Sequence, residues 1–302
     1  MRVTIFGGGG FIGRAITHRL LEQGHEVKVI SRRPPTMPGD ETHHPRPILT
    51  QADPHEPRQR REHLRGQDAA INLVGILHGR PADFERAHIT LAEGIAADCR
   101  AEGVSRLLHM SALHADPEGP STYLRTKGRG EARVLAHACE TLRVTSFRPS
   151  VVFGPEDRFL NTFARLLALS PGVMLLPGAH ARFAPVYVGD VAEAFAAALG
   201  GEDEKSPPAQ RIDLCGPHHY TLLELVRQVS TWSGHRRLIL PLPDRPARLL
   251  ATLMETLPRP PLSRDNLDSM RVDSVCAEGA CLQPTALEQI APAYLGRSPP
   301  PR

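Results

Sequence analysis

The chain has 302 residues, 41% of them hydrophobic, a composition that excludes wholesale disorder and a collagen-like structure. The length fits two domains or one large α/β domain. The formal net charge is only +3, which gives no case for a nucleic-acid-binding protein. No stretch reaches about 18 uninterrupted apolar residues, so we expect no transmembrane segment.

The five cysteines are scattered and show no CxxC spacing. Such a set is typical of a reduced protein without a structural zinc site, so we expect no bound metal and no special role for Cys276 or Cys281. The chain also starts on a strand-like run rather than on a leader sequence, which favours a cytoplasmic protein.

The first half of the chain alternates between short apolar runs and stretches with helical spacing. Residues 2–6 and 27–30 are strand-like, with a glycine cluster and a helical pattern between them. Residues 69–74, 82–102 and 106–110 repeat the order of strand, helix and strand. This alternation predicts an α/β fold with a doubly wound parallel sheet.

The second half contributes a helix over residues 123–139 and a strand over 144–153. A strand at 184–188, a helix at 191–199 and a strand at 211–215 are expected to return to the same sheet. The remaining segments lack that alternation, so we expect them to form a separate, smaller lobe.

We therefore expect two parts. A dinucleotide-binding domain would span residues 1–154 and be completed by about 184–216. Residues 155–183 and 217–302 would form a smaller, mostly helical C-terminal lobe for a substrate or partner.

Residues 7–13 read GGGGFIG and lie between the first expected strand and the first expected helix. The run fits GxGxxG from Gly8 and also GxxGxxG from Gly7. Glycines in this context allow a tight turn and let a pyrophosphate approach the helix N-terminus; a glycine turn without a ligand is the alternative. The expected nucleotide contacts here are Gly7, Gly10, Phe11, Ile12 and Gly13.

The second expected strand ends in Ser31, Arg32 and Arg33, not in the Asp or Glu that would bond the ribose 2′-hydroxyl of NAD. Guanidinium groups suit a 2′-phosphate, so the sequence favours NADP(H) over NAD, with solvated loop arginines as the alternative. Asp53, after the third expected strand, would either bond the adenine side of the cofactor or serve as a turn residue.

Three residues are candidates for catalysis. Ser111 follows the strand at 106–110, and Tyr123 and Lys127 lie four residues apart on one helical face. We expect the Lys127 ammonium to lower the pKa of Tyr123, which would make the phenol a general acid and base, while Ser111 bonds the reacting oxygen. An exposed Tyr and Lys on a helix surface are the alternative.

Taken in order, these motifs resemble the extended, atypical short-chain dehydrogenase/reductase superfamily. Within it the chain is most similar to the branch of the NADPH-binding accessory subunit of mitochondrial complex I and its bacterial relatives. The resemblance implies a Rossmann fold and covers most of the chain. The segments that carry it are GGGGFIGR (7–14), INLVGIL (71–77), HMSAL (109–113), YLRTKGRGE (123–131), RPSVVFGPEDRFLN (148–161) and PVYVGDVAEA (185–194).

The resemblance also implies further cofactor contacts. Tyr123 and Lys127 would bind the nicotinamide ribose, and Arg148 lies in a segment that passes beside the nicotinamide in this superfamily. Val74 and Gly75, at the end of the fourth expected strand, complete the expected set.

One departure from the superfamily pattern affects the function. Active members usually add an Asn from the helix after the fourth strand, but residues 85–93 (ERAHITLAE) contain none. His88 either takes its place or is a surface histidine in contact with solvent. Should the chain be an enzyme, we expect Arg158, Asn161 and Arg182 to line its substrate pocket.

The resemblance thus implies two functions. In the first, bound NADP(H) is structural or regulatory, and the protein acts near respiratory or quinone-linked proteins. In the second, the chain is an active NAD(P)-dependent oxidoreductase or a sugar-nucleotide epimerase or dehydratase that uses Tyr123 and Lys127.

An apolar stripe at helical spacing lies between residues 247 and 257, flanked by arginines. It is either core of the smaller lobe or a docking face for a protein partner or a membrane surface, which would place the protein peripherally at the inner face of a membrane. The stripe consists of Leu249, Leu250, Leu253, Met254 and Leu257.

Overall fold

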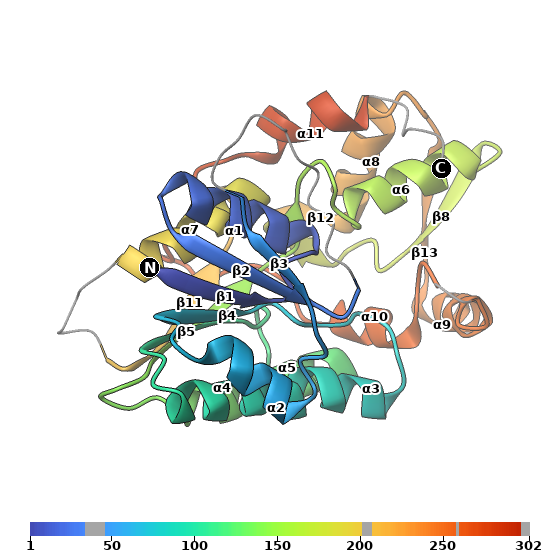
Figure 1. The fold of residues 1–302 in the computed structure, drawn as a ribbon. Coiled ribbons are helices and arrows are strands. Elements are labelled where there is room, and N and C mark those ends of the chain that lie inside the picture. Colours follow the sequence, from blue (N-terminus) through green and yellow to red (C-terminus); the bar gives the residue numbers. More distant parts are fainter. Residues whose placement is uncertain (34–45, 201–206, 258–259, 297–302) are drawn as a thin grey trace. The chain divides into compact units, whose positions relative to one another are not determined.

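The computed structural model describes residues 1–33, 46–200, 207–257 and 260–296 (Figure 1). The chain divides into two compact units. The N-terminal unit consists of Met1–Gly119, Leu124–Arg148 and Gly189–Ile212. The C-terminal unit consists of Pro120–Tyr123, Pro149–Val188 and Asp213–Arg302.

A seven-stranded sheet in the order β11-β6-β5-β4-β1-β2-β3 forms the centre of the N-terminal unit. Strands β1 to β6 pair in parallel, and the strand order reverses between β1 and β4. This confirms the predicted doubly wound α/β sheet, in which ligands bind beyond the carboxyl ends of the strands at the reversal. The strands are β1 Arg2–Phe6, β2 Glu26–Ser31, β3 Ile48–Gln51, β4 Ala69–Asn72, β5 Arg106–Met110, β6 Arg143–Pro149 and β11 Ala209–Leu214.

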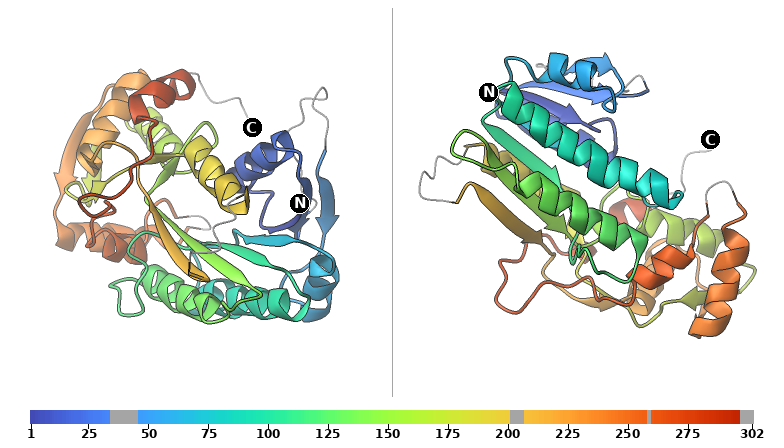
Figure 2. Two further views of the ribbon diagram at one scale, coloured as in Figure 1. Left: turned by 90° about the vertical axis from the view of Figure 1, so that its left-hand side faces the viewer. Right: turned by 90° about the horizontal axis from the view of Figure 1, so that it is seen from below.

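Helices cover both faces of this sheet (Figure 1). Strands such as β4 and β5 are buried almost throughout, as expected for a parallel sheet covered on both sides. On one face α4 and α5 lie side by side (Figure 2). The helices are α1 Phe11–Glu22, α2 Pro57–Leu64, α3 Pro81–Glu85, α4 Leu91–Ala101, α5 Thr122–Leu135 and α7 Val188–Gly200, with a π-helical turn, η1 Arg86–Thr90, joining α3 to α4.

The C-terminal unit combines helices with three two-stranded sheets around its own apolar core. Its paired strands are β7 Val152–Phe153 with β10 Val186–Tyr187, β9 Arg182–Phe183 with β12 Tyr220–Thr221, and β8 Val173–Pro177 with β13 Leu238–Leu242. Its helices are α6 Leu160–Leu169, α8 Leu222–Trp232, α9 Asp244–Met254, α10 Arg264–Ser269 and α11 Leu287–Leu295.

The expectation of unpaired cysteines is wrong for one pair. Cys215, directly after β11, forms a disulfide with Cys276, which lies 61 residues later in the chain. Local spacing does not indicate such a long-range pair, because only the fold brings the two residues together. Cys99, Cys139 and Cys281 are free.

The apolar stripe of α9 is divided between two sides of the helix, because Leu250 and Met254 are half-buried whereas its other members face outward. Leu249 and Leu253 are exposed, and the helix turns Ala247 and Ala251 inward instead. Two small side chains anchor the helix, so its larger leucines are left on the outside. In the part of the chain that is described, no helix is both long and apolar enough to cross a bilayer.

Candidate nucleotide and catalytic site

The glycine run forms the tight turn that the sequence predicts between β1 and α1. Gly7 has a φ of +84°, and its N–H donates to the Ile30 carbonyl at 3.1 Å. A Cβ on Gly13 would lie 2.5 Å from Gly8 Cα, so no larger residue fits there without moving the backbone. A Cβ on Gly7 would approach the Leu73 carbonyl carbon to 3.2 Å, which places the turn against the segment after β4.

The start of α1 fits an anionic ligand. Gly10 is the N-cap and supplies no side-chain hydrogen bond, and the first turn contains no acidic residue. The backbone N–H groups of Phe11, Ile12 and Gly13 therefore begin the helix without a carboxylate or hydroxyl cap. Such N–H groups and the helix dipole are suited to a pyrophosphate, so the residues present fit a dinucleotide.

Ser31 is the last residue of β2, and the exposed Arg32 and Arg33 follow it. The backbone at Arg32 is held by a hydrogen bond in which the Gln51 side-chain amide donates to the Arg32 carbonyl at 3.1 Å. Among the described residues neither guanidinium forms an ion pair. The two arginines lie at the end of β2, where the sequence predicts a contact with a 2′-phosphate.

Asp53 serves as a turn residue. Its carboxylate accepts the N–H of His55 at 3.0 Å, and its own N–H donates to the Gln59 side chain at 2.8 Å. These bonds form the turn that leads from β3 into α2. A contact between Asp53 and the adenine side of a cofactor stays a prediction.

Lys127 lies deep in the N-terminal unit, beside the segment after β4. It is 5% exposed, and its Nζ donates to the Met110 carbonyl at 2.8 Å, next to Ser111. A Cβ on Gly75 would lie 3.3 Å from that Nζ, and the Val74 N–H is fixed by the Asn72 side chain at 3.1 Å. The fold therefore brings Lys127 together with the predicted cofactor contacts that follow β4.

The pKa values of the pair on α5 differ from the sequence expectation. Burial raises the pKa of Tyr123 to about 12, and burial lowers the pKa of Lys127 to about 8, partly offset by the charge of Glu131. Tyr123 lies one helical turn before Lys127, as predicted. A pKa of about 12 leaves the Tyr123 phenol protonated near neutral pH.

Ser111 and His109 present buried polar atoms at the carboxyl end of β5. Ser111 Oγ and His109 Nε2 have no hydrogen-bond partner among the residues that the structure describes. The other ring nitrogen of His109 lies 3.2 Å from Asn72 Nδ2. A buried hydroxyl without a hydrogen bond lowers the stability of the fold unless a ligand supplies the missing partner. This fits the predicted role of Ser111 in bonding the reacting oxygen. His109 belongs to the motif HMSAL, but the sequence gave no reason to expect that its side chain would be part of the site.

His88 is not a surface histidine. It is 2% exposed within η1, accepts the Ile76 N–H at 3.0 Å and lies 2.9 Å from Thr126 Oγ1. Burial, together with the Lys127 charge, lowers the pKa of His88 to about 2, so the ring is neutral. Helical periodicity could not place it, because the π-turn rotates this segment away from regular α-helical positions.

The sequence did not predict which residue caps the N-terminus of α5. The carboxylate of Asp265, from α10, accepts the N–H groups of Thr122 at 2.6 Å and Tyr123 at 3.1 Å. These are two of the N–H groups that a helix start leaves without intrahelical partners. Asp265 thus acts as a helix cap supplied from 142 residues away, and it fixes the backbone of Tyr123.

Arg148 binds a buried carboxylate. Its guanidinium forms a two-pronged contact with Glu131, which also accepts hydrogen bonds from Ser146 and Arg211. Burial alone would raise the pKa of Glu131, but the bonds from Arg148 and Ser146 outweigh it and hold that pKa below its usual value. The cofactor contact expected of Arg148 stays a prediction.

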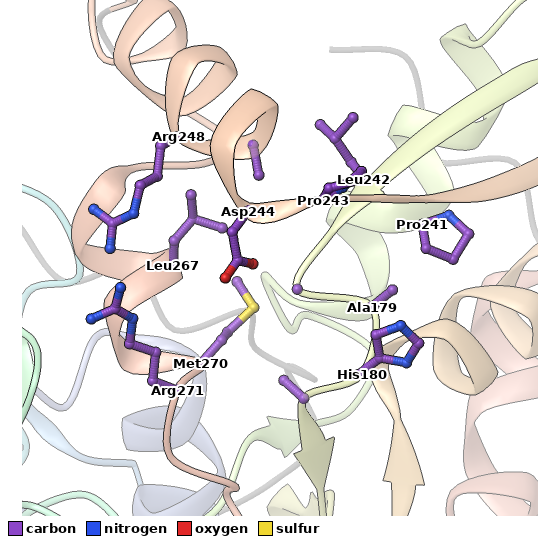
Figure 3. A pocket seen from close by; sticks show the side chains of 13 residues that line it. Ala179, His180, Pro241, Leu242, Pro243, Asp244, Arg248, Leu267, Met270 and Arg271 are labelled. Carbon is purple, nitrogen blue, oxygen red and sulfur yellow. The ribbon is translucent and has the colours of Figure 1, made fainter.

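The C-terminal unit contains a cavity of about 480 Å³ (Figure 3). Residues 178–181 and 241–244 line it together with parts of α9 and α10. The side chains of Arg248 and Arg271 extend beside it, and both bind Asp268. Asp244 also lines the cavity, so its polar edge carries charges of both signs.

The residues expected to line a substrate pocket are not part of this cavity. Arg158 and Arg182 are exposed, and the Asn161 amide donates to the Pro155 and Asp157 carbonyls. Asn161 therefore stabilises the loop before α6. A role for these three residues beside a substrate stays a prediction, because the motif gives no information on which side chains face a cavity.

Comparisons with known proteins identify the family of the chain. The sequence profile described as the NAD dependent epimerase/dehydratase family matches residues 3–212. The mitochondrial NADH dehydrogenase (ubiquinone) 1 alpha subcomplex subunit 9 of Arabidopsis thaliana is 28% identical over 294 residues, covering 92% of this chain and 71% of that protein. The mitochondrial NADH-ubiquinone oxidoreductase 40 kDa subunit of Neurospora crassa is 29% identical over 279 residues, covering 90% and 71%.

A solved structure shares the fold. The UDP-glucose 4-epimerase of Thermus thermophilus, in complex with NAD, has a TM-score of 0.65 and 23% identity. The match covers 90% of this chain and 99% of that one. At this identity the likeness concerns the architecture alone.

Proposed function

The chain belongs to the NAD dependent epimerase/dehydratase family, and from that premise we propose that it is an NADP(H)-binding protein whose nucleotide has a structural or regulatory role. Binding of a nicotinamide dinucleotide follows from the family. The structural role is the new element. It is supported by the similarity to two subunits named for NADH dehydrogenase and NADH-ubiquinone oxidoreductase.

The observation that carries the proposal is the state of His88. Active members of the superfamily use an Asn in this neighbourhood to hold a proton-relay water. Here both ring nitrogens of His88 lie within hydrogen-bond distance of protein atoms, and the pKa of the ring is about 2. A ring held in this way stabilises the segment beside the predicted nucleotide site, and because both of its nitrogens are engaged by protein atoms, it has no ring atom left to hold a relay water as the Asn does.

The preference for NADP(H) rests on Arg32 and Arg33. Both are exposed at the end of β2, the position from which a side chain reaches the adenosine ribose in this fold. Two guanidinium groups at the strand end, in place of the Asp or Glu that would bond a free 2′-hydroxyl, favour a 2′-phosphate. NAD remains the second candidate.

We further propose that the protein works at the inner face of a membrane, near respiratory or quinone-linked proteins, through its C-terminal unit. Both relatives are named as mitochondrial subunits of ubiquinone-linked NADH dehydrogenases. The exposed leucines of α9 supply an apolar face for such an association.

The second candidate is an enzyme, favoured by the buried Ser111 hydroxyl without a partner among the described residues. A bound nicotinamide would supply or accept a hydride. Ser111 would position the reacting oxygen, Tyr123 would exchange the proton, and Lys127 would bind the ribose. A pKa of about 12 keeps the Tyr123 phenol protonated near neutral pH, which is the state that donates a proton in a reduction, but it leaves little phenolate to act as the base in the reverse direction.

The test uses the purified full-length chain. We expect NADPH to stay bound through gel filtration and to raise the melting temperature by about 5 °C at saturation. A chain that neither retains nor is stabilised by any nicotinamide nucleotide contradicts the proposal.

The same sample separates the two candidates. NADPH absorbance is followed during addition of quinones, ketones and aldehydes, with Tyr123→Phe as the control that retains the fold. Unchanged absorbance in both proteins is the result expected for a structural nucleotide. Oxidation in the wild type, lost in Tyr123→Phe, supports a reductase instead.

A further inference from the structure

The sheet formed by β8 and β13 has an exposed apolar face. Met174, Leu176 and Ile239 point into the core of the C-terminal unit. Because side chains alternate along a strand, their neighbours point outward, where a half-covered sheet usually carries polar residues. These outward residues, which we call the strand patch, form two cross-strand pairs with exposed fractions from 41% to 59%: Val173 with Leu238, and Leu175 with Leu240.

A second apolar face follows directly in the chain. Helix α9 begins two residues after β13 ends (Figure 1). Leu249 is 74% exposed, Leu253 is 68% exposed, and Leu257 after the helix is 51% exposed. Spacing by four places the first two on one side of the helix. We call these three leucines the helix patch.

The segments around β8 and β13 carry positive charge alone. Residues 158–189 and 225–243 contain no Asp or Glu. Arg165 and Arg236 are exposed in them, whereas α9 begins with an exposed Asp244 beside the exposed Arg245. The arginines of the two acid-free segments are Arg158, Arg165, Arg182, Arg227, Arg236 and Arg237.

We propose that the strand patch and the helix patch bind the surface of an anionic lipid bilayer. The inference rests on the part of the proposed function that assigns the C-terminal unit to a membrane or partner. Aliphatic side chains on an amphipathic helix enter the boundary between headgroups and acyl chains. Each arginine near the surface adds attraction to anionic headgroups.

Two other occupants fit less well. A second copy of this chain would set acid-free, arginine-bearing segments against each other, with no carboxylate within them to compensate the charge. A protein partner would more typically be bound through aromatic anchors, because Leu and Val are under-represented among the residues that dominate protein interfaces. Both patches consist of Leu and Val alone.

The experiment is cosedimentation of the full chain with vesicles of phosphatidylcholine, either alone or with about one third phosphatidylglycerol. We expect binding to the anionic vesicles that weakens as salt is raised. Leu175→Ser/Leu240→Ser and Leu249→Ser/Leu253→Ser should each lower the partition coefficient at least about tenfold. Arg165→Gln/Arg236→Gln should lower it for anionic vesicles only.

The control is Leu49→Ser/Leu282→Ser, which changes two leucines of 42% and 41% exposure outside both patches and should bind like the wild type. Wild-type chain left in the supernatant with anionic vesicles overturns the inference. So does a variant of either patch that binds normally. A stable dimer in light scattering that Leu175→Ser/Leu240→Ser dissociates would assign the strand patch to a second copy.

Thermal stabilisation by NADPH is measured on the same samples. Loss of vesicle binding with stabilisation retained contradicts only this inference. Loss of stabilisation with vesicle binding retained contradicts only the proposed nucleotide role.

Discussion

His88 Nε2 accepts the backbone N–H of Ile76 at 3.0 Å and thereby joins the π-turn after α3 to the segment that follows β4. Because Nε2 is the acceptor, the proton of the neutral ring lies on Nδ1, which faces Thr126 Oγ1 at 2.9 Å. One buried side chain thus connects two segments beside the predicted nucleotide site, and it does so only while uncharged.

We therefore expect stability to fall in acid more steeply because of His88. In the unfolded chain its pKa is near the ordinary value of 6.5, whereas burial keeps the folded ring unprotonated down to about pH 2. Below about pH 6.5 the unfolded state binds the extra proton, so the free energy of unfolding decreases as pH falls. His88→Asn should reduce that slope by about 1.4 kcal/mol per pH unit, measured by urea unfolding between about pH 6 and pH 4.

The exposed His180 provides the control. His180→Asn also replaces a histidine with asparagine, but at an exposed position, and should leave the acid slope at its wild-type value. A slope that His88→Asn does not change would show that the ring is protonated in the folded protein.

Asp265 caps α5 and orients the backbone at Tyr123. Asp265→Ala removes the acceptor for two N–H groups and should lower the free energy of unfolding by about 1 kcal/mol. Asp265→Asn keeps an acceptor oxygen and should recover most of that loss. Equal losses for both variants in urea unfolding would argue against a capping role and for a purely electrostatic one.

The sequence predicted the parts of the site that local chemistry dictates. A glycine run between a strand and a helix needs no distant partner to form the turn at Gly7, and spacing by four puts Tyr123 and Lys127 on one helical face. Asp265 and the Cys215–Cys276 disulfide act over 142 and 61 residues, so no local pattern indicates them.

The α9 stripe shows a different limit. Periodicity predicts that one side of a helix is apolar, but it does not say whether that side faces core or solvent. Here Ala247 and Ala251 take the inner positions, which a hydrophobicity pattern ranks below Leu249 and Leu253. Of the two interpretations of the stripe, core is therefore wrong for Leu249, Leu253 and Leu257, and only the packing of the helix reveals this.

Arg32 and Arg33 should determine the choice of nucleotide. Arg32→Ser/Arg33→Ser removes the charges expected at the 2′-phosphate, so we expect NADPH affinity to fall about tenfold or more, while NADH affinity changes less than about twofold. Isothermal titration calorimetry with both nucleotides measures the two values. Arg100→Ser, an exposed arginine at the end of α4, is the control. Equal losses for NADPH and NADH would remove the two arginines from 2′-phosphate recognition.

Lys127 should change the pH dependence of the free energy of unfolding in alkaline solution. Its folded pKa of about 8 lies below the ordinary value of about 10.5, because burial disfavours the ammonium. Between these two values the unfolded chain holds a proton that the folded chain has released, so this residue makes the free energy of unfolding rise with pH.

The measurement compares the wild type with Lys127→Met between about pH 8 and pH 10. In the variant the free energy of unfolding should no longer rise over this pH range, because Met does not titrate. This holds whatever the absolute stability of the variant. Tyr123 does not obscure the comparison: its raised folded pKa acts mainly above pH 10, where it lowers stability in both proteins. Parallel profiles would mean that Lys127 remains an ordinary, solvated ammonium, and they would contradict the buried bond from its Nζ to the Met110 carbonyl on which the predicted site is built.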